Sequence, residues 1–343
     1  MAKPRPGQAL TIGWIVLLLL APASAWLAGL RAQLVENRPL APLPQPTSEA
    51  LRKPAFYRQL SQALLEHNPL RSHSLLLKTR FEMKAFLSLA TLEVVPGEQG
   101  WLALRASLER DCRDEAALAA SVSAAMAWIS GLRDSGKPVF LTVAPDKESI
   151  YPDYVPRLHS PEAECVRRSN ALVRAGLRQG GAAYIDLFEI LQQGRRQARP
   201  LYSAGDTHWT GYGSTLAARA MIERISPGLL DGARPAKFDE SQVHPDLFRM
   251  GGLADHETRE RWAWTLGSGR QPDRRRLLVI HDSFFNITRD QFESPYPAVQ
   301  YLHWNDLNPE RLQQEVAAAE VVLIETVERS LPSRFMEYFP ASP

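Results

Sequence analysis

Short apolar segments alternate with helical segments through most of the chain, and this alternation limits the possible folds more than any other feature. Four apolar runs bounded by turn residues predict strands at Pro138–Pro145, Ala182–Phe188, Arg275–Asp282 and Glu320–Thr326. Helical spacing of apolar residues predicts helices at Ala116–Leu132, Pro161–Gly180, Tyr212–Ile225 and Pro309–Ala319. Continuous apolar strands separated by helices are typical of a parallel sheet covered on both faces. The sequence therefore predicts an α/β/α sandwich, with its functional site at the carboxyl ends of the strands.

The amino-terminal segment predicts export. Lys3 and Arg5 precede the mostly apolar stretch Ala9–Leu30, which is long enough to cross a bilayer core of about 30 Å. An uncleaved transmembrane signal-anchor fits this pattern. A signal peptide cleaved after the Ala-Ser-Ala triplet at 23–25 fits it as well. Both alternatives place the body of the protein outside the cytoplasm.

The chain divides into three predicted regions. Residues 1–31 form the signal-anchor, residues 32–55 form a linker that contains the Pro-rich run Arg38–Thr47, and residues 56–343 form the folded body. Within the body, a helix is expected over Phe56–Leu92, and two short strands around a glycine-containing turn are expected over Leu92–Leu104.

Charge and cysteine content narrow the function classes. The 343 residues include 40 basic and 38 acidic side chains, and no long basic run occurs beyond Arg274–Arg276. Nucleic-acid binding, which needs clustered Lys and Arg, is not indicated. Cys112 and Cys165 form either a disulfide, as exported proteins often do, or two free thiols.

Three residues suggest nucleophilic catalysis. Ser283 follows the predicted strand "RRLLVIHD" by one position, so its hydroxyl can face a cleft while the backbone N–H groups after it face an oxyanion. Asp206 and His208 stand two positions apart before a helix, where a carboxylate can orient an imidazole. We therefore expect Asp206 and His208 to serve Ser283 as orienting group and base.

Other interpretations of the same residues stay open. Asp before a helix is often an N-cap, although Thr210 is a good cap by itself. Asp-Ser after a strand is common in turns. A metal site at Asp206 and His208 would need further ligands, such as His281 and Asp282.

Several segments, in order, resemble the alginate O-acetyltransferases of the AlgJ/AlgX type, a branch of the SGNH hydrolase-like group. The stretch "DTHWTGYG" at 206–213 is similar to the D-x-H-W segment of that family, and "HDSFF" at 281–285 resembles its nucleophile block. The other similar segments are "LLEHNPLRS" at 64–72, "VVPGEQGWLAL" at 94–104, "APDKESIYPDYVP" at 144–156 and "ETVERSL" at 325–331.

The resemblance implies an SGNH hydrolase-like fold with Ser283 as nucleophile, His208 as base and Asp206 as its orienting group. His281 is a departure, because the family often has glycine there, and a larger side chain could narrow the pocket or add a donor. The remaining candidates each have a plain alternative. Trp209 stacks on a sugar or is a buried structural residue, Lys147 binds substrate or anchors its loop through a salt bridge, and Asn286 is an oxyanion donor or a loop residue. Arg289 is a candidate contact for an anionic polymer.

By this resemblance the protein is an O-acetyltransferase at the periplasmic face of the inner membrane. It would acetylate an exopolysaccharide, alginate or a related polymer, with acetyl groups supplied by a multipass membrane acyltransferase and without a soluble cofactor or metal. A carbohydrate esterase with the same three residues is an alternative, because both reactions share an acyl-enzyme. A non-catalytic scaffold that binds polysaccharide within an export complex is a second alternative.

Overall fold

The computed structural model describes residues 20–22, 24–31, 41–70, 74, 77, 81, 92–109, 115–155, 160–196, 199–253 and 255–339. The chain forms two compact units, residues 1–94 with 248–255 and residues 95–247 with 256–343. In the first unit, helix α2 (Pro54–Glu66) begins with a proline and confirms the start of the predicted helix. The helix ends at Glu66 with His67 as its C-cap, so one continuous helix over Phe56–Leu92 is wrong. Most of residues 71–91, and most of the predicted membrane segment, lie outside the described residues.

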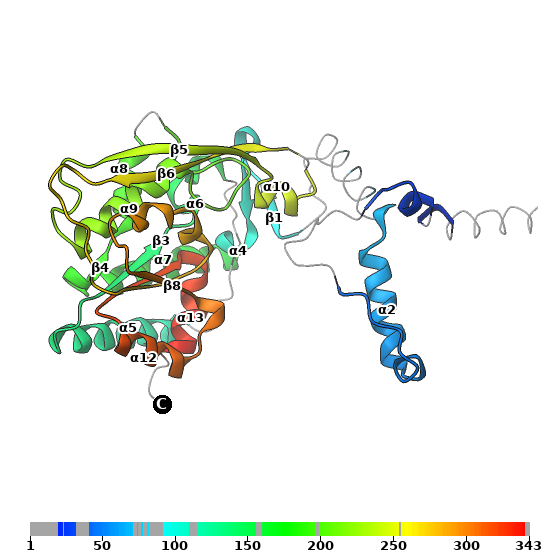
Figure 1. The fold of residues 1–343 in the computed structure, drawn as a ribbon, viewed down its shortest axis with the longest axis horizontal. Coiled ribbons are helices and arrows are strands. Elements are labelled where there is room, and N and C mark those ends of the chain that lie inside the picture. Colours follow the sequence, from blue (N-terminus) through cyan, green and yellow to red (C-terminus); the bar gives the residue numbers. More distant parts are fainter. Residues whose placement is uncertain are drawn as a thin grey trace, which may run out of the picture. The chain divides into compact units, whose positions relative to one another are not determined.

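A five-stranded parallel sheet forms the centre of the second unit (Figure 1). Its strands, in spatial order, are β4 (Tyr184–Ile185), β3 (Val139–Ala144), β9 (Val321–Val327), β7 (Leu277–His281) and β8 (Val299–His303). All neighbouring pairs are parallel. The predicted α/β fold with a central parallel sheet is therefore confirmed, and the strand order places the end of β7 beside that of β9.

Helices cover both faces of this sheet. Helices α8 (Leu187–Gly194) and α9 (Gly211–Ile225) pack on one face. The other face is covered by α5 (Glu115–Asp134), α7 (Pro161–Arg178), α12 (Pro309–Ala318) and α13 (Leu331–Tyr338). Side chains of β9 alternate between the two cores, with Leu323 in the first and Ile324 in the second. This alternation, buried on both sides, explains why β9 is apolar along most of its length.

The strand predicted at 182–188 is shorter than expected. Only Tyr184 and Ile185 are in β4, because Asp186 caps α8 by accepting a hydrogen bond from the backbone N–H of Glu189. Apolar residues after the cap, such as Leu187, therefore face the core from a helix. The predicted strands at 92–104 are present as β1 (Val94–Pro96) and β2 (Leu102–Leu104), which pair with each other.

A long antiparallel hairpin is an element that the sequence analysis did not predict. Its strands β5 (Arg234–Val243) and β6 (Glu257–Thr265) run beside α9 on the same side of the sheet (Figure 1). Most of β5 is exposed and polar, so it has none of the apolar character by which the buried strands were found. The edge strand β8 was also missed, since only Leu302 in it is fully buried.

Among the described residues, α5 is the one helix long and apolar enough to cross a membrane. Its residues Leu118, Val122 and Ile129 are buried against the sheet, as in a core helix. Cys165 in α7 is disulfide-bonded. Cys112 lies outside the described residues, so its pairing with Cys165 stays a prediction.

Two glycines offer a matched test of the packing around α9. A Cβ at Gly213 would lie 2.3 Å from the carbonyl oxygen of Leu201, which already accepts from the Thr210 N–H. Gly213→Ala should therefore lower the free energy of unfolding by about 1–3 kcal/mol. Gly131 in α5 is exposed with open space around it, so Gly131→Ala should raise that energy by roughly 0.5–1 kcal/mol. Urea unfolding measures both, and equal effects of the two changes would contradict this packing.

Candidate active site

The end of β7 presents Ser283 in a turn that is fixed by its neighbour. Ser283 begins the short helix η5 (Ser283–Ile287), and the Asp282 side chain caps it by accepting the Phe284 N–H at 3.0 Å. The other carboxylate oxygen of Asp282 accepts from the Val327 N–H at 2.7 Å and from Arg334 at 2.7 Å. One buried carboxylate therefore ties the serine turn to the end of β9. The Phe284 N–H is already engaged, which corrects the expectation that it faces an oxyanion.

Asp206, His208 and Ser283 come together in one hydrogen-bonded chain. His208 Nδ1 lies 2.7 Å from Asp206 Oδ1, and His208 Nε2 lies 2.9 Å from Ser283 Oγ. Because an ionised carboxylate only accepts, Nδ1 carries the proton, which leaves Nε2 free to accept from the serine hydroxyl. Burial would raise the pKa of Asp206, but hydrogen bonds from His208 and the charge of Arg259 hold it below its usual range. The geometry is that of a serine activated by an imidazole base.

Lys147 holds the loop that carries this pair. Its side chain is fully buried at the start of α6 (Lys147–Ile150), three residues after the end of β3. The ammonium donates to the backbone carbonyls of Ser203, Ala204 and Asp206 at 3.1, 2.9 and 2.9 Å. All three of its N–H groups are thereby used. Lys147 was expected either to bind substrate or to anchor its loop through a salt bridge. It anchors a loop, but its partners are backbone carbonyls and not a carboxylate. Its side chain is too buried to bind substrate.

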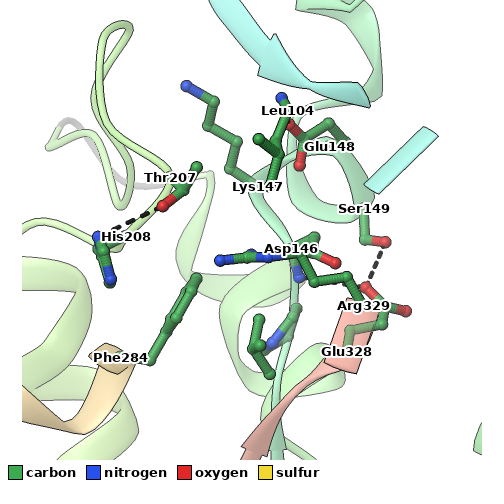
Figure 2. Close-up of polar contacts among 12 residues, drawn as sticks. Leu104, Asp146, Lys147, Glu148, Ser149, Thr207, His208, Phe284, Glu328 and Arg329 are labelled. Carbon is green, nitrogen blue, oxygen red and sulfur yellow. Dashed lines mark hydrogen bonds and ion pairs between the residues drawn. The ribbon is translucent and has the colours of Figure 1, made fainter. Parts of the chain in front are cut away.

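The hairpin and the segment that connects its two strands hold the same loop from another side. Arg259 of β6 donates to Asp206 Oδ2 at 2.8 Å, and Glu257, two residues earlier, accepts the Gly205 N–H at 2.9 Å. Asp246 accepts from both the backbone N–H and the hydroxyl of Thr207. The Thr207 hydroxyl also lies 3.4 Å from His208 Nδ1 (Figure 2). Sequence analysis missed these residues because nothing in their local pattern links the hairpin to the loop.

A second charged cluster fixes the edge of the sheet beside Phe284, the residue after Ser283 (Figure 2). Arg329, after β9, pairs with Asp146 and lies with its guanidinium 5.3 Å from the centre of the Phe284 ring. Glu328 accepts from the Asp146 N–H at 3.1 Å and from the Ser149 hydroxyl at 2.6 Å. Burial raises the pKa of Asp146 to about 7, against the lowering effect of Arg329. These bonds join the ends of β3 and β9.

Ligand atoms of Asp206, His208 and Asp246 lie within 4.8 Å of one another, so the metal alternative can be tested against the contacts. His208 Nδ1 is bonded to Asp206, and the Arg259 guanidinium occupies the other oxygen of that carboxylate. His281, proposed as a further ligand, bonds to Arg289 and to the Asp282 carbonyl. A cation at this place would have to displace Arg259, and the contacts fit a hydrogen-bonded catalytic group better.

The aromatic and histidine candidates beside the site are structural. Trp209 borders the cleft described below, but it is 1% exposed and donates its indole N–H to the Phe284 carbonyl at 3.1 Å. These contacts fit the alternative of a buried structural residue better than that of a sugar-stacking residue. His281 is fully buried beneath the site and does not narrow the cleft, and burial lowers its pKa to about 4.

Arg289 and Asn286 do not line the cleft that contains Asp206 and His208. Arg289 donates to His281 Nε2 at 2.7 Å, and its guanidinium lies 4.7 Å from the centre of the Tyr301 ring. It is absent from the lining of the cleft that contains His208, so it is not positioned there to meet an anionic polymer. Asn286 is exposed in η5 and also does not line that cleft.

An open cleft of about 380 Å³ lies on the other side of His208. It is bordered by the loop before α9 and by β6, and its charged or aromatic lining includes Arg199, Asp206, Tyr212, Glu257, Arg259 and Glu260. Ser283 is not in this lining, but His208, whose Nε2 lies 2.9 Å from the Ser283 hydroxyl, is. A concave site that contains such a base is a usual place for a substrate.

The fold and this site define an α/β protein of the SGNH hydrolase-like class. Residues 94–278 match the family model described as "SGNH hydrolase-like domain, acetyltransferase AlgX", which is more than half of the chain. The chain therefore belongs to this acetyltransferase family. The match includes Lys147, Asp206 and His208 and ends before Ser283.

A solved structure agrees with this fold, and two others are similar at lower TM-scores. The O-acetyltransferase domain of Pseudomonas putida AlgJ is similar over 70% of this chain and 92% of its own, with 20% identity and a TM-score of 0.53. Pseudomonas aeruginosa AlgX is similar over 70% of this chain and 65% of its own, at 12% identity and a TM-score of 0.48. The structure of Bacillus cereus PatB1 with a sulfonyl adduct is similar over 69% of this chain and 94% of its own, at 12% identity and a TM-score of 0.49. No curated protein matches the sequence.

Lys147 offers a test of the loop that it holds. Lys147→Met removes three charge-assisted hydrogen bonds from the carbonyls behind Asp206, and kcat for ester turnover should fall at least tenfold with a smaller change in KM. Lys137 is a matched control, because its ammonium donates to the carbonyls of Val316, Ala317 and Ala319, away from the site. Lys137→Met should lower stability and leave kcat per folded molecule intact. Equal losses of kcat in both variants would contradict the role of Lys147.

The same residue predicts a pH dependence. Burial lowers the pKa of Lys147 to about 8, although the charges of Glu148, Asp246, Asp206 and Glu257 raise it. As pH rises through about 8 the ammonium loses its charge and one donor, so turnover should decline there. Lys147→Met should lack this decline. If turnover falls at alkaline pH in the same way in both proteins, the decline does not come from Lys147.

Proposed function

We propose that this protein is an O-acetyltransferase that moves an acetyl group from an ester donor to a hydroxyl of a polysaccharide through an acyl-enzyme on Ser283. The observation that carries the proposal is the continuous chain from Asp206 through His208 to Ser283 beside an open cleft. Membership of an acetyltransferase family supports the choice of acetyl as the transferred group.

The first half of the reaction forms the acyl-enzyme. His208 Nε2 takes the proton of the Ser283 hydroxyl as Oγ attacks the acetyl carbonyl of the donor, and Asp206 stabilises the imidazolium. Collapse of the tetrahedral intermediate breaks the donor C–O bond, and the imidazolium returns its proton to the leaving oxygen. The acetyl group is then an ester of Ser283.

The second half repeats these steps with a new nucleophile. His208 takes the proton of a sugar hydroxyl in the cleft, the hydroxyl oxygen attacks the acetyl carbonyl, and Ser283 Oγ leaves with the proton from His208. Water in place of the sugar gives the carbohydrate esterase alternative. The two are separated by the ratio of acetylated oligosaccharide to free acetate, and acetate alone with every acceptor would favour the esterase.

The donor and the location follow from the resemblance and from the amino terminus. We propose a multipass membrane acyltransferase as the source of acetyl groups and the periplasmic face of the inner membrane as the location. The Pro-rich run Arg38–Thr47 would keep the body within a few tens of Å of the bilayer, since extended residues span about 3.1 Å each. A free hydrolase has no need of such proximity.

The anchor is tested by carbonate extraction of native membranes. An uncleaved apolar segment at Ala9–Leu30 should keep the protein in the membrane fraction. Release of a protein whose sequence begins near Trp26 would instead show a cleaved signal peptide, and the alternative of a protein free in the periplasm would replace the anchor.

The three residues should act as a unit. Ser283→Ala, His208→Ala and Asp206→Ala should each lower kcat for ester turnover by about 10³-fold or more, and double variants should lose little beyond the larger single effect. Ser135→Ala is the control, because Ser135 is exposed and its hydroxyl donates to the Leu132 carbonyl in α5's last turn. Near-normal turnover by Ser283→Ala would refute the assignment, and so would additive losses. A polysaccharide-binding scaffold would show no turnover in any of these proteins.

A further inference from the structure

The charges that line the cleft are unequal in number. Two guanidinium groups, those of Arg199 and Arg259, face three carboxylates, those of Asp206, Glu257 and Glu260. His208 must be neutral to act as a base, so it adds no positive charge in the resting state. The lining therefore carries one more negative than positive charge. The charge that a ligand would contact also depends on which of these side chains already pair with one another.

Both positive charges have partners within the protein. Arg259 donates to Asp206 at 2.8 Å and so belongs to the catalytic chain. Arg199 lies with its guanidinium 5.6 Å from the centre of the Tyr212 ring and 5.4 Å from that of Trp262, and 3.9 Å from Glu260. A carboxylate on a ligand would have to compete with Asp206 for one arginine and with Glu260 for the other.

The two glutamates extend negative charge along the cleft. Glu257 accepts the backbone N–H of Gly205, and Glu260 accepts the indole N–H of Trp262 at 3.1 Å. Lys237, which is not in the lining, lies 3.4 Å from Glu260 but bonds more closely to Glu240. Both glutamates therefore keep ionised oxygens at the surface that a ligand would contact, and a like charge placed there is repelled.

We infer that the cleft beside His208 takes an uncharged sugar as the acetyl acceptor and disfavours sugars that carry a carboxylate. The inference rests on the proposed function, because it assigns the acceptor of that same site. A neutral sugar offers hydroxyl groups that can donate to Glu257 and Glu260 and displaces no ion pair. A polyuronate would bring one carboxylate for each sugar residue into a cleft whose arginines are already paired.

The experiment compares two acceptors that differ at C6 alone, where mannose has a hydroxymethyl group and mannuronate has a carboxylate; acetyl groups are counted on the ring hydroxyls that both acceptors share. Oligomers of β-1,4-linked mannose and of β-1,4-linked mannuronate, of equal length, are offered with one acetyl-ester donor at low salt. The acetylated oligosaccharide and free acetate are both measured. The ratio of kcat/KM for mannose oligomers to that for mannuronate oligomers should be about tenfold or more, and it should shrink as salt screens the repulsion.

A charge change in the cleft sharpens the test. Glu260→Gln keeps an oxygen for the Trp262 N–H, removes one negative charge and frees Arg199, so the acceptor ratio should fall several-fold towards one. Glu320→Gln is the matched control, because Glu320 also pairs with an arginine, Arg276, but lies at the opposite end of β9. Its acceptor ratio should equal that of the unchanged protein. Each ratio is taken within one protein, so differences in folded fraction cancel.

The outcomes distinguish a wrong acceptor from a wrong proposed function. A preference for mannuronate oligomers, or a ratio that Glu260→Gln leaves unchanged, overturns the inference while transfer itself stands. Acetate as the sole product with both acceptors overturns the proposed transferase function, and the acceptor inference falls with it.

Discussion

The buried ammonium of Lys147 is the interaction on which the geometry of the site depends. Placing a lone charge in the protein interior costs several kcal/mol, and here three backbone carbonyls of the segment 203–206 offset that cost. Because Lys147 lies three residues after the end of β3, these bonds join the loop of Asp206 and His208 to the carboxyl edge of the sheet. The loop would otherwise be a stretch of surface chain with no strand to fix it.

A different charged group, the Asp282 carboxylate, fixes Ser283, the proposed nucleophile. Asp282 accepts hydrogen bonds from the turn of Ser283, from Val327 at the end of β9 and from Arg334 of α13. Burial and the charge of Asp282 raise the pKa of the neighbouring Glu325 well above its usual range. The two halves of the site also contact each other, because the Trp209 indole donates to the Phe284 carbonyl at 3.1 Å. Their alignment at 2.9 Å follows from the parallel order of β3, β9 and β7, which brings the strand ends side by side.

The sheet and the residues Asp206, His208 and Ser283 could be predicted because each has a recognisable pattern in the local sequence. Buried strands such as β9 are continuous apolar runs, and a D-x-H pair with a serine after a strand has few chemical uses. Contacts between residues far apart in the sequence have no such local pattern and could not be predicted. Arg259 reaches Asp206 from an exposed hairpin that lacks an apolar pattern, and Trp209 next to His208 turned out to be buried behind the site. The accepting carbonyls around Lys147 belong to the backbone, which the residue types do not reveal.

The central claim is that Ser283 carries the acetyl group. The most direct measurement mixes the protein with an acetyl-ester donor without acceptor, stops the reaction with acid, and maps acetylated peptides by mass spectrometry. The account predicts one acetyl group on the peptide that contains Ser283, its loss when an acceptor sugar is added, and its absence from Ser283→Ala. Continued turnover with no acetyl on Ser283, or acetyl on another residue that transfers it equally fast, would contradict the account.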